Sequence, residues 1–308
     1  DRLTMNSDDP SSLVFTYDGN SGFLSNGTQF TSIEMVSVGT GSGDDIFNLS
    51  GTANGSFNGG GFGVDTLNAD FSGPKLNEGP DDSQITVWGE GELDGILNGQ
   101  CYFYMFDNID LVATDADSRI FVDFRQPFVG TTLACDGGLG NDTLFVTAYW
   151  FSDDLLFSVE SDGSSTNNLG LTTANFERYV VATGNGDDVI AAGDGDDVIF
   201  GGEGDDILEG GAGADDLEGW FGADTFLFES LGDFSDGPQL DNIRDFSAAD
   251  GDLIDLTEIT ADPDAAGDQT FSFIGDAAFS GNGSGAELRY VTDGFDTHVE
   301  GDIDGDGA

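Results

Sequence analysis

The chain has 308 residues, of which 60 are acidic and seven are basic, so its formal net charge at pH 7 is −53. Self-repulsion of that size opposes a compact state, and an acidic surface repels the phosphates of nucleic acids and anionic membranes. The hydrophobic share of 38% and the 26 Phe residues nevertheless exclude a disordered acidic tail. We therefore expect a folded chain neutralised by cations, with no nucleic-acid partner and, since no apolar run reaches about 18 residues, no membrane span.

Residues 1–178 are predicted to form a divergent β-solenoid region. Short alternating runs such as "ITVWG", "CYFYMF", "IFVDF" and "TLFVTAYWF" are typical of strands, and clusters of Gly, Asn, Asp and Ser separate them. Three longer stretches, 30–47, 105–121 and 175–191, align along most of their length, each as a buried strand that leads into an acidic turn. This pattern predicts three divergent modules, at about residues 13–73, 85–150 and 155–178.

Two features of this region leave alternatives open. Cys101 and Cys135 either form a disulfide that closes a loop of roughly 35 residues, worth about 3 to 4 kcal/mol, or are two free thiols. Tyr149 and Trp150, in "TAYWF", either stack against a carbohydrate or pack in the core or between coils, and we favour packing.

A strict repeat of nine residues begins at Thr183 and ends at Leu227. Its five copies read TGNGDDVIA, AGDGDDVIF, GGEGDDILE, GGAGADDLE and GWFGADTFL. Position eight of each copy is apolar, which predicts a short strand with one inward side chain after a six-residue turn. Position six is always aspartate: Asp188, Asp197, Asp206, Asp215 and Asp224.

The glycines of the repeat indicate how these turns fold. Positions two and four permit a positive φ and let carbonyl oxygens converge; they are Gly184, Gly186, Gly193, Gly195, Gly202, Gly204, Gly211 and Gly213. If two copies complete one coil, aspartates 18 residues apart stack at a strand spacing of about 4.8 Å. Stacked carboxylates repel one another unless a cation lies between them.

These residues resemble the haemolysin-type calcium-binding nonapeptide, GGxGxDxUx, of RTX proteins. The resemblance implies a parallel β-roll over residues 179–227 with several Ca²⁺ ions in its turns, held by the position-six aspartates and the glycine turns. Ligand chemistry agrees, because flexible loops of carboxylates and carbonyls suit Ca²⁺ better than Mg²⁺. Zinc is disfavoured, since the chain has one histidine and no cysteine near the repeats. We expect calcium binding to drive folding.

Further matches to the nonapeptide lie in the first region, at residues 40–48, 60–68 and 137–145. By the same resemblance they add three metal-binding aspartates, Asp45, Asp65 and Asp142. The turn "TDADSRIF" of the middle module aligns Arg119 with the metal-binding aspartate. Its guanidinium either replaces a lost ion or is a surface group in a degenerate loop.

After Leu227 the period stops, and residues 228–308 resemble the region that follows the repeats in serralysin-type proteases and related secreted RTX enzymes. The resemblance implies a β-rich cap and a type I secretion signal, which is inferred rather than seen. The closing "DIDGDG" also resembles the start of an EF-hand loop. Its aspartates either bind calcium or form an acidic turn: Asp302, Asp304 and Asp306.

No catalytic residue is predicted. The zinc-protease motif HExxH and the nucleophile elbow GxSxG are both absent, and His298 is the only histidine. A calcium-using polysaccharide lyase would need cationic groups near an acidic sugar. The chain has only one lysine and six arginines, which disfavours such an enzyme.

The sequence thus predicts an all-β chain: a parallel β-roll or β-solenoid with Ca²⁺ in its turns, a divergent β-helical region before it and a β-rich cap after it. The expected function is that of a non-enzymatic calcium-binding structural protein, extracellular or on a bacterial cell surface. It would self-associate into a surface layer or filament, or act as an adhesin for an extracellular glycan. The alternative is the folding and secretion module of a glycan-active enzyme, such as an alginate epimerase or polysaccharide lyase.

Overall fold

The structure is a computed structural model of the whole chain. It describes residues 2–6, 13–18, 20–25, 29–32, 35–40, 43–50, 55–59, 64–70, 83–89, 93–97, 101–106, 108–113, 117–124, 132–233, 240–259, 271–281, 286–292 and 296–303.

The described chain is all-β, as the sequence predicts, and most strand pairs are parallel. Its only helical segment is one 3₁₀ turn, Leu231–Asp233. No helix in the described ranges is long and apolar enough to cross a membrane. Two compact units are present: residues 1–227 with 232–254 form the first, and residues 228–231 with 255–308 form the second.

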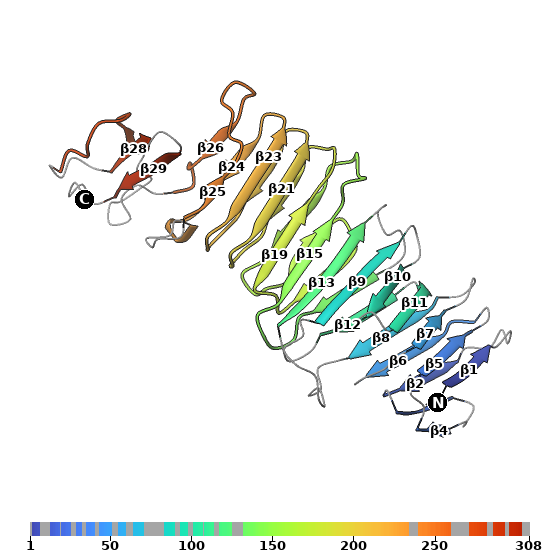
Figure 1. Ribbon diagram of the computed structural model, residues 1–308. Helices are drawn as coiled ribbons and strands as arrows, with labels where there is room; N and C mark the ends of the chain where they lie inside the picture. Colours follow the sequence, from blue (N-terminus) through green and yellow to red (C-terminus); the bar gives the residue numbers. More distant parts are fainter. Residues whose placement is uncertain are drawn as a thin grey trace. The chain divides into compact units, whose positions relative to one another are not determined.

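Three sheets build the first unit, in which neighbouring coils place their strands side by side (Figure 1). The 12-stranded sheet has the order β1 (Arg2–Asn6), β5 (Met35–Gly39), β7 (Gly55–Asn58), β11 (Cys101–Phe106), β10 (Leu93–Leu97), β9 (Ser83–Gly89), β13 (Ser118–Phe124), β15 (Thr143–Thr147), β19 (Arg178–Ala182), β21 (Val198–Glu203), β23 (Asp216–Phe221) and β25 (Asn242–Ile243).

The other two sheets are shorter. The 8-stranded sheet has the order β18 (Leu171–Ala174), β14 (Thr132–Asp136), β12 (Asn108–Val112), β8 (Thr66–Asp70), β6 (Ile46–Ser50), β2 (Val14–Tyr17), β3 (Ser21–Leu24) and β4 (Gln29–Thr31). The 6-stranded sheet has the order β17 (Ser165–Asn167), β16 (Leu156–Val159), β20 (Val189–Ala191), β22 (Ile207–Glu209), β24 (Thr225–Leu227) and β26 (Leu253–Asp255).

Two nonapeptides complete one coil, as predicted. Successive copies alternate between the 12-stranded and the 6-stranded sheet, and residues 18 positions apart pair in parallel, as Ile199 does with Leu217 and Ile190 with Leu208. The period of 18 follows because each copy supplies one turn and one short strand, so the chain returns to the same sheet after two copies.

The core of the repeat region is a double column of position-eight side chains. Each is at most 1% exposed. Successive side chains of a strand point to opposite faces, so position eight points inward and its two neighbours point outward. At about 25 cal/mol per Å² of apolar surface, burying a side chain of this size contributes about 1.5 to 3 kcal/mol. The column consists of Ile190, Ile199, Leu208, Leu217 and Phe226.

The solenoid continues past Leu227, where the nonapeptide period ends. β25 pairs with β23 in the 12-stranded sheet, and β26 follows β24 in the 6-stranded sheet. Residues 240–254 therefore form one more coil on the last repeat. The second unit contains a separate small sheet of β27 (Ser272–Phe273), β28 (Glu287–Thr292) and β29 (Thr297–Asp302).

Two open questions of the first region receive answers. Cys135 is a buried free thiol whose pKa burial raises, so the disulfide is not formed; the side chain of Cys101 lies outside the described residues. Tyr149 and Trp150 follow the end of β15 in a turn and are 55% and 73% exposed, so the expectation that they pack in the core or between coils is wrong.

Candidate metal centre

The position-six aspartates form a ladder of hydrogen bonds along one edge of the solenoid. The backbone N–H of Asp188 donates to Oδ1 of Asp206 at 2.8 Å, and the N–H of Asp206 donates to Oδ1 of Asp224 at 3.0 Å. Leu155 begins this ladder by donating to Asp188, and Asp252 ends it by accepting from Asp224. One carboxylate oxygen of each aspartate is thus used to join its coil to the coil before it.

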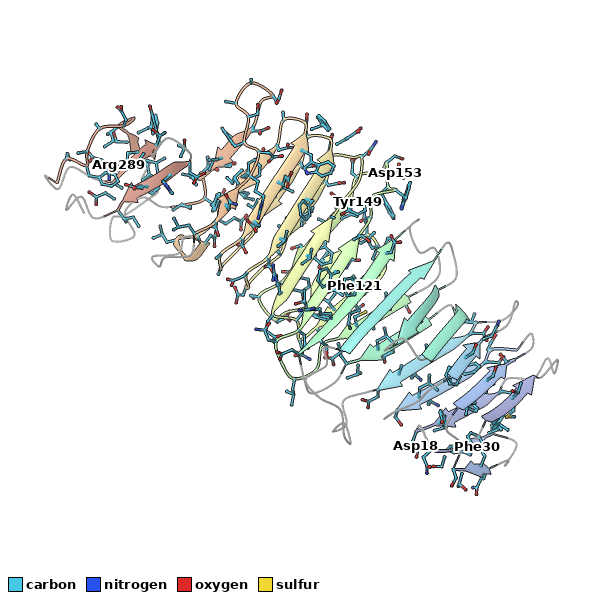
Figure 2. The ribbon with its side chains drawn as sticks, in the orientation of Figure 1. Asp18, Phe30, Phe121, Tyr149, Asp153 and Arg289 are labelled. Carbon is cyan, nitrogen blue, oxygen red and sulfur yellow. The ribbon has the colours of Figure 1, made fainter. Side chains whose placement is uncertain are left out.

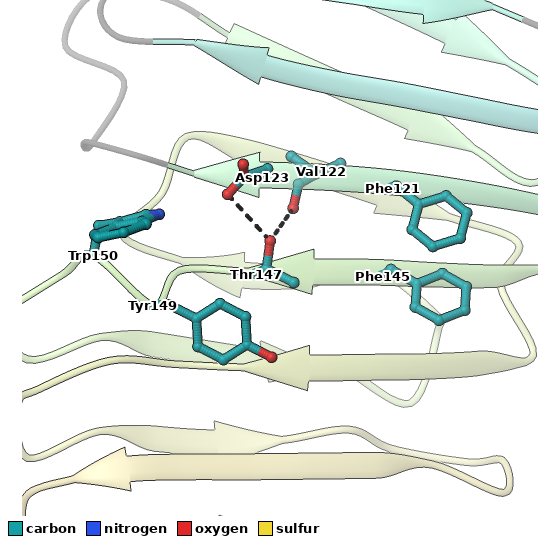
Figure 3. Close-up of a pocket in the computed structure, with 7 residues that line it drawn as sticks. All are labelled: Phe121, Val122, Asp123, Phe145, Thr147, Tyr149 and Trp150. Atoms are coloured by element: carbon teal, nitrogen blue, oxygen red, sulfur yellow. Dashed lines mark hydrogen bonds between the residues drawn. The ribbon is translucent and has the colours of Figure 1, made fainter. Parts of the chain in front are cut away.

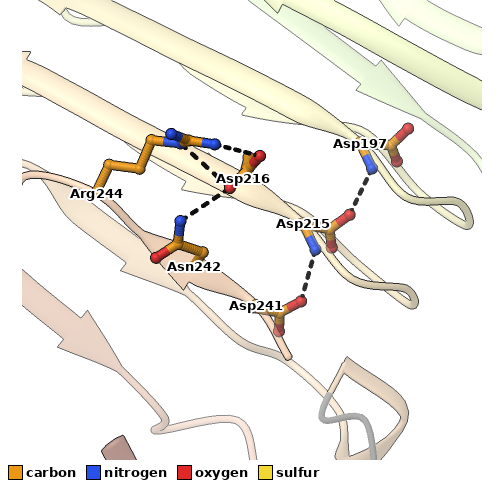
Figure 4. A network of polar contacts seen from close by, with 6 residues as sticks. All are labelled: Asp197, Asp215, Asp216, Asp241, Asn242 and Arg244. Carbon is orange, nitrogen blue, oxygen red and sulfur yellow. Dashed lines mark hydrogen bonds and ion pairs between the residues drawn. The ribbon is translucent and has the colours of Figure 1, made fainter. Parts of the chain in front are cut away.

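A second ladder runs through the aspartates of the alternate copies, from Asp197 through Asp215 to Asp241 (Figure 4). The N–H of Asp197 donates to Oδ1 of Asp215 at 2.7 Å, and the N–H of Asp215 donates to Oδ1 of Asp241 at 2.9 Å. Tyr179 begins it by donating to Asp197. Beside this ladder, on the outward face of β23, Asp216 accepts two hydrogen bonds from the guanidinium of Arg244.

The second carboxylate oxygen is buried and has no protein hydrogen-bond partner. This holds for Oδ2 of six aspartates at position six, which are about 1% exposed. Burying an ionised oxygen without a partner is strongly unfavourable, and native proteins avoid it. The same unpartnered oxygen recurs in both ladders, at Asp188 and Asp206 in the first and at Asp197 and Asp215 in the second, which indicates a repeated cation-binding position rather than one local irregularity. The six are Asp45, Asp142, Asp188, Asp197, Asp206 and Asp215.

The electrostatics of the ladders agree with this conclusion. Burial raises the pKa of Asp197 to about 8 and those of Asp206 and Asp215 to about 7, with neighbouring carboxylates adding to the effect. Burial likewise raises the pKa of Asp188 and Asp224. A bound cation would reverse these shifts, because it stabilises the charged form of each carboxylate.

The glycines bring the turns of successive coils into backbone contact. A Cβ at Gly202, where φ is 111°, would lie 2.1 Å from Gly184 O, so no other residue fits there. The predicted positive φ is confirmed at Gly193, Gly195, Gly202, Gly204, Gly211 and Gly213. Gly184 and Gly186 lack it; they are needed because a Cβ would meet the turn before them, 2.5 Å from Phe151 O and 2.9 Å from Asp153 O.

Glycine at position one, which the sequence prediction left out, lies beside Oδ2 of the position-six aspartate. A Cβ on Gly201 would lie 2.3 Å from Asp206 Oδ2, and Gly210 and Gly219 stand in the same relation to Asp215 and Asp224. The absence of a side chain keeps this space open beside each Oδ2.

A third, exposed ladder at position five links the coils in the reverse direction. Oδ1 of Asp187 accepts from the N–H of Asp205 at 3.0 Å, and Oδ1 of Asp205 accepts from Ala223 at 2.9 Å. At position six the backbone N–H donates to the carboxylate of the later coil. At position five the N–H donates to the carboxylate of the earlier coil. The recurring "GDD" of the first three copies was the available signal for it.

The ladder pattern also occurs in the first region, at the three aspartates that the sequence predicts. Asp45, Asp65 and Asp142 are at most 2% exposed. Leu13 donates to Asp45 at 2.7 Å, and the N–H of Asp45 donates to Oδ1 of Asp65 at 2.9 Å. Burial raises the pKa of Asp142 to about 6.

The assignment of Arg119 to the metal-binding position is wrong. Ser118 occupies it: Ser118 is buried and its N–H donates to Oδ1 of Asp142 at 2.6 Å. Asp117 takes position five, since its Oδ1 accepts from Asn141 at 3.0 Å. Arg119 falls one residue later and its side chain is exposed on β13. A letter-by-letter alignment without a gap misplaced this turn by one residue.

Some ladder members were missed because they lie outside the repeats. Asp241 and Asp252 complete the last copies, and a Glu177 carboxylate oxygen accepts from the N–H of Asp142 at 2.7 Å. Asp302 is a buried residue at the end of β29 in the second unit, and Asp304 and Asp306 lie outside the described residues.

The donor set suits calcium. Within the described ranges no three side chains of His, Cys, Asp or Glu come together as a metal cluster. The ladders do place unpartnered aspartate oxygens beside glycine turns, and hard oxygen ligands in flexible loops favour Ca²⁺.

Comparison with known families supports the same assignment. Residues 182–217 and 192–226 match the model of the RTX calcium-binding nonapeptide repeat. The matched segment contains the position-six aspartates from Asp188 to Asp224, and RTX repeats bind calcium ions. A search of curated proteins finds no match to the chain.

Proposed function

We propose, starting from the RTX calcium-binding repeats of residues 182–226, that this protein is a secreted structural protein that calcium folds outside the cell. Proteins with these repeats are typically exported by type I systems. The chain would serve as a component of a bacterial surface layer, filament or adhesin. The observation that carries the proposal is the recurring buried Oδ2 without a partner, because an external cation would neutralise it in the folded state.

Calcium concentration would act as the switch between the unfolded and folded chain. Extracellular modules bind Ca²⁺ at roughly 10⁻⁴ to 10⁻³ M, far above cytosolic levels. At a hundredfold excess over its dissociation constant, each independent site adds about 2.7 kcal/mol to the free energy of unfolding. The many ladder carboxylates then stabilise the coil instead of repelling one another.

The open parallel sheets support assembly. In the described part of the chain β1 is the outermost strand of the 12-stranded sheet, and an outermost strand presents backbone groups that another strand can pair with. A non-enzymatic role is part of the proposal. His298, the only histidine of the sequence, is exposed on β29 opposite Val291.

The test compares the chain in excess chelator, in millimolar Ca²⁺ and in millimolar Mg²⁺. We expect the far-UV circular dichroism of a β-protein in Ca²⁺ only, followed by growth of particles in sedimentation velocity and electron microscopy. An unchanged β signal after chelation would exclude calcium-driven folding. A monomer that persists in Ca²⁺ at high protein concentration would exclude assembly, and turnover of uronate polymers by the chain would exclude the non-enzymatic role.

A further inference from the structure

Four aromatic side chains are exposed on one edge of the solenoid. Tyr149, Trp150, Trp220 and Phe221 are 55%, 73%, 56% and 71% exposed, and we call this set the aromatic platform. Tyr149 and Asp153 project from this edge in Figure 2. Large aromatic rings are usually buried, so a group of four in the solvent requires an explanation.

Backbone hydrogen bonds place the two pairs of rings on the same edge. Asn185 N–H donates to Phe151 O at 2.7 Å, and Gly204 N–H donates to Phe221 O at 2.9 Å. Between these two contacts Asn185 bridges in parallel to Glu203. The turn that holds Trp150 and the turn that holds Trp220 are thus three coils apart, or about 14 Å at the usual strand spacing.

The backbone at Trp220 is strained. Trp220 occupies position two of its repeat, where Gly184, Gly193, Gly202 and Gly211 stand in the other copies, and its φ is 72°. This left-handed conformation is unfavourable for any residue with a Cβ. Because the side chain is exposed, core packing does not offset the strain. A strained, exposed aromatic residue is a sign of a binding role.

Each pair of rings borders an open hollow that contains carboxylates. The first, of about 350 Å³, extends from Tyr149 and Trp150 over the rings of Phe121 and Phe145, which stack at 4.1 Å (Figure 3). Asp123 lies in it and accepts a hydrogen bond from Thr147 at 3.3 Å.

The second hollow, of about 440 Å³, lies at Trp220 and Phe221. The carboxylate-bearing residues Asp205 and Asp250 border it. Both hollows therefore combine flat aromatic faces with hydrogen-bond acceptors, and no cationic side chain is among the described residues that line them.

This chemistry matches an uncharged sugar ring, which has an apolar C–H face and a rim of hydroxyl donors. A uronate, phosphate or sulfate polymer would be repelled by the carboxylates that border the two hollows. A second copy of the chain would bring the same carboxylates face to face. We propose that the aromatic platform binds an uncharged polysaccharide across several coils. This inference goes beyond the proposed assembly and does not depend on it.

The test is affinity electrophoresis and calorimetry in millimolar Ca²⁺, with dextran, laminarin and hydroxyethyl cellulose as uncharged probes and alginate as the anionic probe. We expect at least one uncharged polymer to retard the wild-type chain. Trp150→Ala and Trp220→Gly should each weaken its affinity about tenfold, as the loss of an aromatic anchor does, and the double variant should abolish retardation. Trp220→Gly restores the glycine of the other repeats and so should keep the calcium-dependent fold.

Phe273→Ala is the matched control, since Phe273 is 65% exposed but belongs to the second unit. Circular dichroism of the wild-type chain in the same buffers measures its calcium-dependent folding. Failure of the proposed function is thus measured separately from failure of polymer binding. The proposal that the platform binds an uncharged polysaccharide would be overturned if none of the uncharged polymers retards the wild-type chain. Equal retardation of the wild-type chain and the double variant would overturn it as well. Stronger retardation by alginate, or loss of self-association in place of polymer binding in the double variant, would also overturn it.

Discussion

Asp197 and Asp215 are joined by a hydrogen bond of 2.7 Å from the backbone N–H of the first to Oδ1 of the second, while Oδ2 of both is buried without a partner. The two oxygens of one carboxylate therefore differ: Oδ1 accepts the hydrogen bond that joins neighbouring coils, and Oδ2 has no protein partner. We expect Oδ2 to be the oxygen that binds a cation.

Replacing one ladder carboxylate by its amide should have opposite effects with and without calcium. Asp215→Asn keeps an oxygen for the N–H of Asp197 but removes a buried charge. We expect the calcium midpoint of folding to rise about tenfold, as for loss of a charged hydrogen-bonding ligand, and the calcium-free folded state to become less unfavourable. Calcium titration by circular dichroism measures both effects.

Asp196→Asn is the matched control for that variant. Its Oδ1 also accepts a backbone N–H, from Ala214 at 3.1 Å, but the group belongs to the exposed position-five ladder. Equal shifts of the midpoint in the two variants would contradict a special role for position six.

Acidification should partly replace calcium. The pKa of Asp197 is about 8 and those of Asp206 and Asp215 are about 7, against 3.8 in the unfolded chain. Because the folded state binds these protons more tightly, its stability is highest below the unfolded pKa and falls as pH rises through about 7 to 8. In excess chelator the β signal should therefore be stronger near pH 5 than at pH 8. A signal that increases with pH would contradict this sign.

Calcium binding should show the reverse dependence on pH. Protons compete for the same carboxylates, so the calcium dissociation constant should increase as pH falls through about 7 to 8. Calorimetry in two buffers of different ionisation enthalpy would detect the released protons. Binding without proton release at pH 7 would contradict the raised pKa values.

The inward column should tolerate truncation poorly. Leu208→Ala removes a fully buried side chain and should reduce the free energy of unfolding in calcium by about 2 to 5 kcal/mol. Ile207→Ala, one residue earlier and 39% exposed, should change it by only about 0.5 kcal/mol. Denaturant titrations in saturating Ca²⁺ compare the two, and similar losses would show that the strand is not oriented as described.

Ser118 offers a gain of function. Ser118→Asp would place a carboxylate at position six of its turn, where Ser118 now donates its N–H to Asp142. Without calcium the added like charge should destabilise the folded state, and with calcium it should stabilise it. Arg119→Ala should leave the calcium midpoint nearly unchanged, because Arg119 is outside the ladder. A large shift of the midpoint in that variant would show that Arg119 takes part in the metal-binding turn.

The periodic part of the chain was predictable because local chemistry repeats there. Asp188 and Asp206 recur with their glycines every 18 residues, and that spacing fixes both the coil and the ladder. Glu177, Asp241 and Asp252 were not predictable, since they join the ladders from irregular segments whose register only the three-dimensional stacking defines. Composition could not reveal the exposure of Trp150, because an aromatic residue in an alternating run resembles a core residue until the strand end is known.

The direction of the position-six ladder gives the solenoid a polarity. In the RTX repeats each position-six residue donates its N–H to a carboxylate of the coil that follows, and the last two repeats rely on Asp241 and Asp252, which lie beyond the RTX match. A fragment cut at Leu227 would leave the N–H groups of Asp215 and Asp224 facing water. The smallest piece that closes its own final coil therefore ends after Asp252, and the nonapeptides alone are an incomplete folding unit.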